Sequence, residues 1–321
     1  DRVGIPSGID ARREMGLAKQ GKNPIFAEMS TPMGMTSENV ARKYFVTRRE
    51  CDEFAVESHR RAAIARVGGV FDREISLFPE KYFSDRGLPA VFGDDGIREG
   101  TTVESLGGLR PSFKKGGVTT AGNSSQITDG AAGAVVYSRA AAESKDLRVL
   151  GVLRGSAVVG LRPNIMGIGP LYAIPKALEN AGINISDVDL FELNEAFATQ
   201  AIVCVKELKL DMKKVNVNGG AIALGHPLGC TGVRQIVSIV NQLRSRGGGV
   251  GVVVSEGGEG GEGGDDDESD FGGEESDESD FGESKKKAKK AAVVAKKPAA
   301  KKPAAKKPAE VSRKRKGNTR N

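Results

Sequence analysis

The stretch that decides the fold runs from Val188 to Leu210 and reads VDLFELNEAFATQAIVCVKELKL. It opens with a short apolar run, which predicts a buried strand that ends near Leu193. A helix is predicted to begin near Asn194, because asparagine favours the position that caps a helix. A strand that passes directly into a helix is typical of layered α/β proteins.

The segments on both sides continue this alternation. Arg148–Gly160 predicts a strand, and Pro170–Gly182 predicts a helix with a proline early and a glycine at its end. Farther along, the sequence predicts a short strand at Lys214–Gly220, a helix at Gly232–Gly248 and a final strand at Val250–Ser255. Strands that alternate with helices indicate the α/β fold class.

The first half of the chain is less regular. Thr47 and Glu50 have the spacing of a capping box, which predicts a helix from this point. His59 falls on a charged face of that helix, and we expect it to be solvated. Ala121–Ser138 passes from a polar loop into small and β-branched residues, which predicts a helix or turn that leads to a buried strand.

The character of the sequence changes after Ser255. Residues 256–283 contain 14 acidic residues and no basic one, whereas residues 285–321 contain 16 basic residues and one acidic residue. Few of these side chains can be buried, so the ordering entropy would go uncompensated, and residues 257–321 are predicted to be disordered. The body before this tail is only mildly positive, with 32 basic and 27 acidic residues, which does not indicate a nucleic-acid-binding surface.

Composition excludes several other classes. The cysteines Cys51, Cys204 and Cys230 are widely and irregularly spaced, which excludes a disulfide framework and a zinc knuckle, and no metal site is predicted. No apolar run approaches the roughly 18 residues of a membrane span, so no membrane partner is predicted.

Two motifs carry candidate chemistry, NEAFA (Asn194–Ala198) and GHPLG (Gly225–Gly229). A polar group between a strand end and a helix start is well placed for catalysis in α/β proteins. A histidine on a glycine turn can be held in one orientation while a ligand approaches the backbone closely. Asn194 and His226 together suit the stabilisation of an oxyanion or enolate, an effect worth roughly 3–4 kcal/mol per donor.

These motifs resemble those of the thiolases, coenzyme-A-dependent acyltransferases that cleave 3-ketoacyl-CoA or condense two acetyl-CoA molecules. The resemblance covers roughly residues 30–255 and is greatest to the peroxisomal 3-ketoacyl-CoA type. Five segments match in thiolase order: MGMTSENVA (Met33–Ala41), TTAGNSSQITDGAA (Thr119–Ala132), MGIGP (Met166–Pro170), NEAFA, and VNVNGGAIALGHPLGCTG (Val215–Gly232).

The resemblance implies a partial thiolase fold, a layered α/β/α arrangement with an inserted loop domain. Residues 1–142 would be the remnant of the N-terminal domain, mostly loop domain, and residues 143–256 the C-terminal domain, followed by the tail at 257–321. By the same resemblance, Asn194 would hold the water of an oxyanion hole, and His226 would complete the hole and take the proton of the nucleophile. Coenzyme A would be a co-substrate, with no permanently bound cofactor. Contacts to the substrate are implied for Ser125, Ala121, Met33, Phe113 and Phe197.

Two departures from the thiolase pattern bear on activity. The nucleophilic cysteine of thiolases precedes the loop domain, in a region that is absent from this sequence, so we expect the chain to be N-terminally incomplete. A second catalytic cysteine follows the last strand in a pattern like VVSMCIG, whereas this chain reads VVVSEGG and has Glu256 and Gly257 there. We therefore expect no covalent acyl transfer by these 321 residues.

Two hypotheses remain open. The first is a 3-ketoacyl-CoA thiolase of fatty-acid β-oxidation, homodimeric and peroxisomal by resemblance, of which this sequence is an incomplete part. The second is a catalytically dead, CoA-binding thiolase relative. The basic tail at 285–321 resembles chromatin-type tails that bind nucleic acid, and SRKRK (Ser312–Lys316) resembles a nuclear import signal. The alternative for the tail is an extension acquired by gene fusion or by an error of gene assembly.

Overall fold

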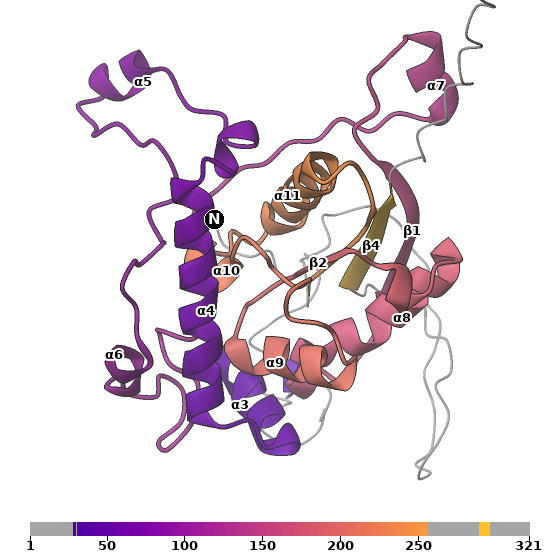
Figure 1. The fold of residues 1–321 in the computed structure, drawn as a ribbon. Coiled ribbons are helices and arrows are strands. Elements are labelled where there is room, and N and C mark those ends of the chain that lie inside the picture. The colour runs from indigo at the N-terminus through magenta and orange to yellow at the C-terminus, as the bar shows by residue number, and fades with distance from the viewer. Residues whose placement is uncertain (1–27, 30, 256–288, 296–321) are drawn as a thin grey trace, which may run out of the picture.

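The computed structural model of the protein describes residues 28–29, 31–255 and, as backbone alone, 289–295 (Figure 1). The helices and strands in chain order are α3 (Met33–Tyr44), α4 (Arg48–Val67), η1 (Phe71–Arg73), α5 (Glu80–Ser84), α6 (Val103–Gly107), α7 (Arg139–Ser144), β1 (Val152–Val159), η2 (Pro163–Ile168), α8 (Pro170–Ala181), η3 (Ile185–Asp187), β2 (Leu190–Leu193), α9 (Ala198–Glu207), α10 (Ala221–Leu224), α11 (Thr231–Ser245), β3 (Val250–Val254) and β4 (Lys289–Ala295).

The strands form one sheet in the order β1-β4-β3-β2. Strands β2 and β3 are parallel, with Leu190 opposite Gly251 and Leu193 opposite Val254. Strand β4 is antiparallel to both of its neighbours. The carboxyl ends of β2 and β3 therefore meet at the same edge of the sheet, where the turn that carries Asn194 begins.

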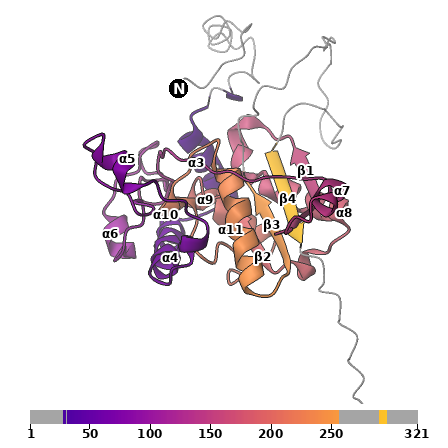
Figure 2. The same cartoon turned by 90° about the horizontal axis from the view of Figure 1, so that it is seen from above.

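Helices cover the sheet on both faces (Figures 1 and 2). Alternate side chains of β3 point to opposite sides because successive residues of a strand face opposite ways. Val252 and Val254 pack with residues of α8 and α9, whereas Val253 packs with Ile239 and Leu243 of α11. The second half is thus an α/β/α sandwich, as the alternation of strands and helices predicts.

Several local predictions are confirmed. The capping box opens α4, since Thr47 Oγ1 accepts a hydrogen bond from the Glu50 amide and a Glu50 carboxylate oxygen accepts one from the Thr47 amide at 2.7 Å. Helix α8 has Pro170 in its first turn and ends at Gly182, which adopts the left-handed conformation at φ 65°. Strands β1 and β3 lie within the predicted ranges, and helix α11 begins one residue before its predicted range.

The prediction of a buried strand within Ala121–Ser138 is wrong. Residues 127–138 form no helix or strand, and Ile127, Val135 and Val136 are exposed. Figure 1 shows this segment running from the polar loop near α10 to α7, apart from the sheet. No strand among the described residues pairs with it, and β-branched side chains alone do not make a strand without a paired neighbour.

The prediction that residues 257–321 are disordered is wrong for residues 289–295. These residues form β4, which pairs with β1 on one side and with β3 on the other. The segment reads KKAAVVA, a short run of small and β-branched residues inside an otherwise charged tail. Backbone hydrogen bonds to the two neighbouring strands compensate for the entropy lost when this segment is ordered, and composition does not reveal these bonds. The other residues of the predicted tail lie outside the described residues.

Three smaller predictions are also wrong. Helix α9 begins at Ala198, so Asn194 lies in the preceding turn and does not cap the helix. Lys214–Gly220 makes only an isolated bridge between Val215 and Phe191. His59 is buried, because α4 packs against the segment around Arg98, whose amide donates a hydrogen bond to His59 Nδ1 at 3.2 Å.

Candidate active site

Asn194 and His226 come together at the carboxyl edge of the sheet. The Asn194 amide donates a hydrogen bond to Val254 O at 3.0 Å, which fixes the turn after β2 to the end of β3. His226 lies 32 residues later, two residues beyond α10, and its Nε2 is 3.3 Å from Asn194 Nδ2. The structure thus places the two predicted residues side by side.

The hydrogen bonds of His226 fix its tautomer. Asn194 Nδ2 can only donate, so the facing Nε2 accepts from it, and the Thr231 hydroxyl, which lies 3.0 Å from Pro227 O, can donate there while its oxygen accepts from the imidazole. His226 Nδ1 lies 2.7 Å from this oxygen and therefore carries the proton in the neutral ring. Nε2 is then unprotonated and accepts a hydrogen bond from Nδ2 of the Asn194 side chain. A lone pair on Nε2 is what a proton acceptor requires.

The ring is neutral at neutral pH. Burial lowers the pKa of His226 below its usual value, and the positive charge of Arg234 lowers it further. Arg234 lies on α11 and pairs with the buried carboxylate of Glu192 at 3.3 Å. Burial nevertheless raises the pKa of Glu192 to about 7, because desolvation outweighs the attraction of the guanidinium.

The turn that carries His226 depends on glycine. Gly225 adopts φ 89°, and a Cβ there would overlap the side chain of Thr128. The close approach lets the His226 amide donate to Gln126 O at 3.3 Å. Only glycine allows both this backbone conformation and this contact.

Ser125 lies between the two turns. Its amide donates to Ala196 O at 2.9 Å, in the turn after Asn194, while the next residue, Gln126, binds the His226 amide. The loop 124–126 thus joins the NEAFA and GHPLG turns. Ala121 lies exposed earlier in this loop, and no hydrogen bond of the described residues joins it to Asn194 or His226.

The predicted apolar contacts form a strip beside the site. The rings of Phe113 and Phe197 meet edge to face, with centroids 6.2 Å apart. A Cβ on Gly34 would overlap the Phe113 ring, so the first turn of α3 reaches the same place. Met33 and Phe113 are each nearly half exposed, at 47% and 44%. The strip therefore offers apolar surface to a ligand.

No thiolate accompanies the pair among the described residues. Cys51, Cys204 and Cys230 are all buried. Burial raises the pKa of Cys51 to about 12, with the neighbouring carboxylates adding to the effect, and burial also raises the pKa of Cys230. A thiol, unlike a thiolate, is a poor nucleophile. Glu256 and Gly257, at the expected place of a second cysteine, lie outside the described residues.

Two residues that serve the site escaped sequence analysis. Thr231 fixes the imidazole tautomer, and its position five residues after His226 in the same motif was the available signal. Glu195 is fully buried and accepts hydrogen bonds from three segments of the chain. Its place beside Asn194 was visible, but its partners are remote in sequence.

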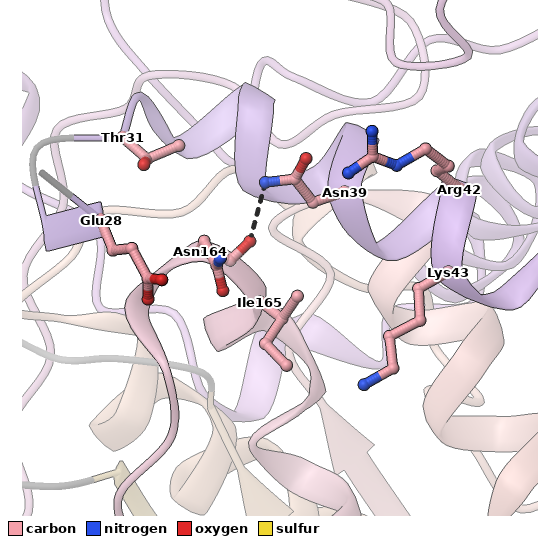
Figure 3. A pocket seen from close by; sticks show the side chains of 7 residues that line it. All are labelled: Glu28, Thr31, Asn39, Arg42, Lys43, Asn164 and Ile165. Atoms are coloured by element: carbon pink, nitrogen blue, oxygen red, sulfur yellow. Dashed lines mark hydrogen bonds between the residues drawn. The ribbon is translucent and has the colours of Figure 1, made fainter. Parts of the chain in front are cut away.

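A cavity of about 550 Å³ lies elsewhere, between α3 and η2 (Figure 3). Asn39 donates a hydrogen bond from Nδ2 to Asn164 O at 3.1 Å within it, and Arg42 and Lys43 line the side formed by α3. None of the predicted site residues lines this cavity.

Two further observations concern the described part of the chain. No three side chains of histidine, cysteine, aspartate or glutamate lie close enough together there to hold a metal ion. None of the helices in these ranges is both long and apolar enough to cross a lipid bilayer.

Known proteins match the chain in two ways. The family model for the thiolase N-terminal domain matches residues 10–140, and that for the thiolase C-terminal domain matches residues 147–264. The peroxisomal 3-ketoacyl-CoA thiolase A of Mus musculus is 47% identical over 255 residues, which are 76% of this chain and 60% of that protein.

Solved structures agree with these matches. The dimeric peroxisomal thiolase of Saccharomyces cerevisiae has a TM-score of 0.71 at 36% identity, over 92% of this chain and 65% of that chain. Human mitochondrial 3-ketoacyl-CoA thiolase in complex with CoA has a TM-score of 0.68 at 33% identity, over 92% of this chain and 66% of that chain. The chain spans 50–60% of the length of the curated relatives that it matches.

Proposed function

The chain belongs to the thiolase family, and from this premise we propose that it serves the thiolytic cleavage of a 3-ketoacyl-CoA to acetyl-CoA and a shortened acyl-CoA. The observation that carries the proposal is the pair of Asn194 and His226, held 3.3 Å apart at the edge of the sheet. The matching family models on both sides of residue 142 support the division into an N-terminal and a C-terminal part.

The two residues have different tasks in this proposal. Neutral His226 takes the proton of an attacking thiol on Nε2, because Nδ1 already donates to Thr231. The protonated Nε2 and the Asn194 amide group then donate toward the oxygen on which negative charge develops, Asn194 through a water. Donors fixed before the reaction need no reorganisation during it, and removal of one such donor costs about 10²–10³ in kcat.

The pantetheine arm of the CoA thioester lies, in this proposal, along the loop that contains Ser125 and Ala121. The apolar strip of Met33, Phe113 and Phe197 packs against the arm or the acyl group. The supporting observations are that Ser125 joins the two turns of the site and that the strip is partly exposed beside it.

The nucleophilic thiolate is the part that the described residues do not supply. All three cysteines are buried, and the pKa values of Cys51 and Cys230 are raised. We therefore expect the 321 residues alone to bind CoA thioesters without acyl transfer. A complete site would need a thiolate from sequence beyond these residues, and sequencing the full transcript would show whether such a segment exists.

The relatives support a proposal for assembly and compartment. The yeast relative is described as dimeric and peroxisomal, and the mouse relative as peroxisomal. We propose a homodimer that works in fatty-acid β-oxidation in the peroxisome.

A second candidate function is a CoA-thioester-binding protein that never catalyses acyl transfer. The burial of all three thiols favours it. The two candidates differ in one respect, which is whether the native protein brings a thiolate to Asn194 and His226.

Two measurements test the proposal. Calorimetric titration should show that the chain binds acetyl-CoA more tightly than CoA, because only the thioester offers a carbonyl oxygen to the donors on the Asn194 side, where the side-chain amide is held by His226 Nε2. Asn194→Ala and His226→Ala should each reduce this preference by about tenfold and leave CoA affinity unchanged. Asn39→Ala, in the cavity of Figure 3, is the control and should leave both affinities unchanged.

Equal affinities for acetyl-CoA and CoA, unaltered in the two variants, would contradict the proposed site. The second measurement is thiolysis of acetoacetyl-CoA, which should be undetectable with the 321-residue chain. Turnover that disappears in His226→Ala would contradict the expected lack of a thiolate.

A further inference from the structure

Glu195 is a buried carboxylate whose partners come from three distant parts of the chain. It is 1% exposed and directly follows Asn194. One carboxylate oxygen accepts hydrogen bonds from the Ser58 hydroxyl at 2.6 Å and the Ile222 amide at 3.2 Å. The other oxygen accepts from Asn216 Nδ2 at 2.7 Å. A carboxylate that is taken from water needs such partners, and here each of them donates.

On one side, these bonds reach the turn that carries His226. Ile222 lies in α10, which ends at Leu224, immediately before Gly225 and His226. The Gly220 amide, at the start of α10, donates to Ser58 Oγ at 3.1 Å, and this hydroxyl donates on to Glu195. The carboxylate therefore binds the amide end of α10 both directly and through Ser58.

On the other side, the hydrogen bonds of Glu195 reach the turn that carries Asn194. Asn216 binds both backbone groups of Leu193, with its Oδ1 accepting from the amide at 2.8 Å and its Nδ2 donating to the carbonyl at 2.7 Å. The same Nδ2 donates to Glu195. The end of β2 and the start of α10 are thus connected through a single carboxylate.

The surroundings leave room for a carboxylate and for little else. A Cβ on Gly220 would overlap the carboxylate of Glu195. Gly220 has φ −129° and ψ −163°, an extended conformation that any residue adopts, so the absence of a side chain there reflects this contact and not backbone strain.

Glutamine cannot replace Glu195 without loss. Its amide NH2 would face a donor at one of the two oxygen positions. Asn216 cannot turn its amide group over, because Oδ1 already accepts from the Leu193 amide. At the other oxygen, the Ile222 amide is a backbone donor that cannot reverse its role.

We infer that Glu195 is a positioning residue that sets the separation of Asn194 and His226 by tying the end of β2 to the start of α10. It touches neither substrate nor reacting atoms and acts through the two turns. The inference rests on the proposed function for its purpose, whereas the positioning itself is a property of the fold.

The test compares the full chain with Glu195→Gln and with a matched control, Glu38→Gln. Glu38 is also buried, and it also accepts backbone hydrogen bonds, from the Val118 and Thr119 amides, but neither amide belongs to β2, to α10 or to the two turns that follow them. Two readouts are used. One is the ratio of acetyl-CoA to CoA affinity, and the other is the imidazole region of the NMR spectrum, where the chain has only His59 and His226.

Glu195→Gln should lower the preference for acetyl-CoA by about tenfold and shift the His226 resonances, while CoA affinity stays within about twofold. Glu38→Gln should leave the ratio and the His226 resonances unchanged, even if it lowers the melting temperature. A residue with a purely structural role would lower the melting temperature in the same way as Glu38 and would leave the ratio intact.

If Glu195→Gln fails to fold, Ser58→Ala tests the inference instead. This variant removes one hydrogen-bond donor to Glu195 and the acceptor of the Gly220 amide, and it removes little side-chain volume. It should shift the ratio in the same direction by about threefold. An unchanged ratio with unchanged His226 resonances in the folded variant overturns the inference. If the unmodified chain itself shows no preference for acetyl-CoA, the proposed function fails, and the His226 resonances alone then decide the positioning.

Discussion

Two segments of similar composition lie in opposite environments in this protein. Residues 130–138 read GAAGAVVYS, and residues 289–295 read KKAAVVA. The first segment forms no strand, with Val135 80% and Val136 86% exposed. The second forms β4 and pairs with a strand on each side. The difference shows that a segment with two adjacent valines forms a strand only where neighbouring strands are in place to pair with its backbone.

The sequence predicted the reverse for both segments. A run of small and β-branched residues favoured a strand near residue 135, and the surrounding charge favoured disorder near residue 292. β-propensity measures how a side chain fits a half-buried pleated surface, and it says nothing about whether that surface exists. The sheet of the second half supplies this surface to β4, between β1 and β3.

The largest expected effect comes from proline in the paired segment. Val293 lies opposite Gly155 on one side and Val252 on the other, so Val293→Pro removes an amide from the interior of the sheet. We expect a loss of about 3 kcal/mol or more in the free energy of unfolding. Val135→Pro, in the exposed segment, should cost at most about 0.5 kcal/mol. Urea unfolding of the two variants measures both, and equal losses would remove the distinction between the segments.

A pH-dependent effect of nearly this size is expected within the sheet. Burial raises the pKa of Glu192 to about 7 from 4.5. The folded chain holds this proton more tightly than the unfolded chain, so the stabilising contribution is complete below the unfolded pKa and is lost as pH rises through about 7. Relative to Glu192→Gln, the unmodified chain should lose up to about 3 kcal/mol between about pH 4 and pH 8.

Urea unfolding at a series of pH values measures this difference. Glu143→Gln is the control, because Glu143 is exposed on α7, next to the unpaired segment. Its stability should follow that of the unmodified chain at every pH. Parallel curves for Glu192→Gln and the unmodified chain would contradict the assignment of a buried, easily protonated carboxylate.

The smallest expected effect comes from making the same substitution, valine to alanine, in a buried strand and in the exposed segment. Val252 in β3 is fully buried and packs with residues of α8 and α9. Val252→Ala should cost about 2 kcal/mol, since it removes buried methyl groups and leaves a cavity. Val136→Ala removes the same atoms from an exposed side chain and should change the free energy of unfolding by less than about 0.5 kcal/mol. A comparable loss at Val136 would indicate that this segment is covered in solution.

Much of the fold could be predicted from local signals. The capping box at Thr47, Gly182 after α8 and the alternation around β2 each depend on residues close in sequence. Burial that depends on remote contacts could not be predicted. His59 is buried because the segment around Arg98 packs on its helix, and no residue close to His59 in the sequence indicates this burial.

The site divides in the same way. Asn194 and His226 could be identified from their motifs, and the structure brings them together, while their roles remain proposals. Glu195 stands in the same motif, but its function depends on Ser58, which is 137 residues away. Binding of nucleic acid by residues 285–321 stays a prediction, since most of this segment lies outside the described residues.

The central claim is that neutral His226 presents an unprotonated Nε2, beside Asn194, to the thiol that attacks a thioester. Nitrogen-15 NMR of the imidazole rings near neutral pH tests it most directly, because the two ring nitrogens resonate differently when protonated. We expect His226 to be protonated on Nδ1 alone, with an Nε2 resonance typical of an unprotonated nitrogen. A proton on Nε2 in the neutral ring would contradict the claim.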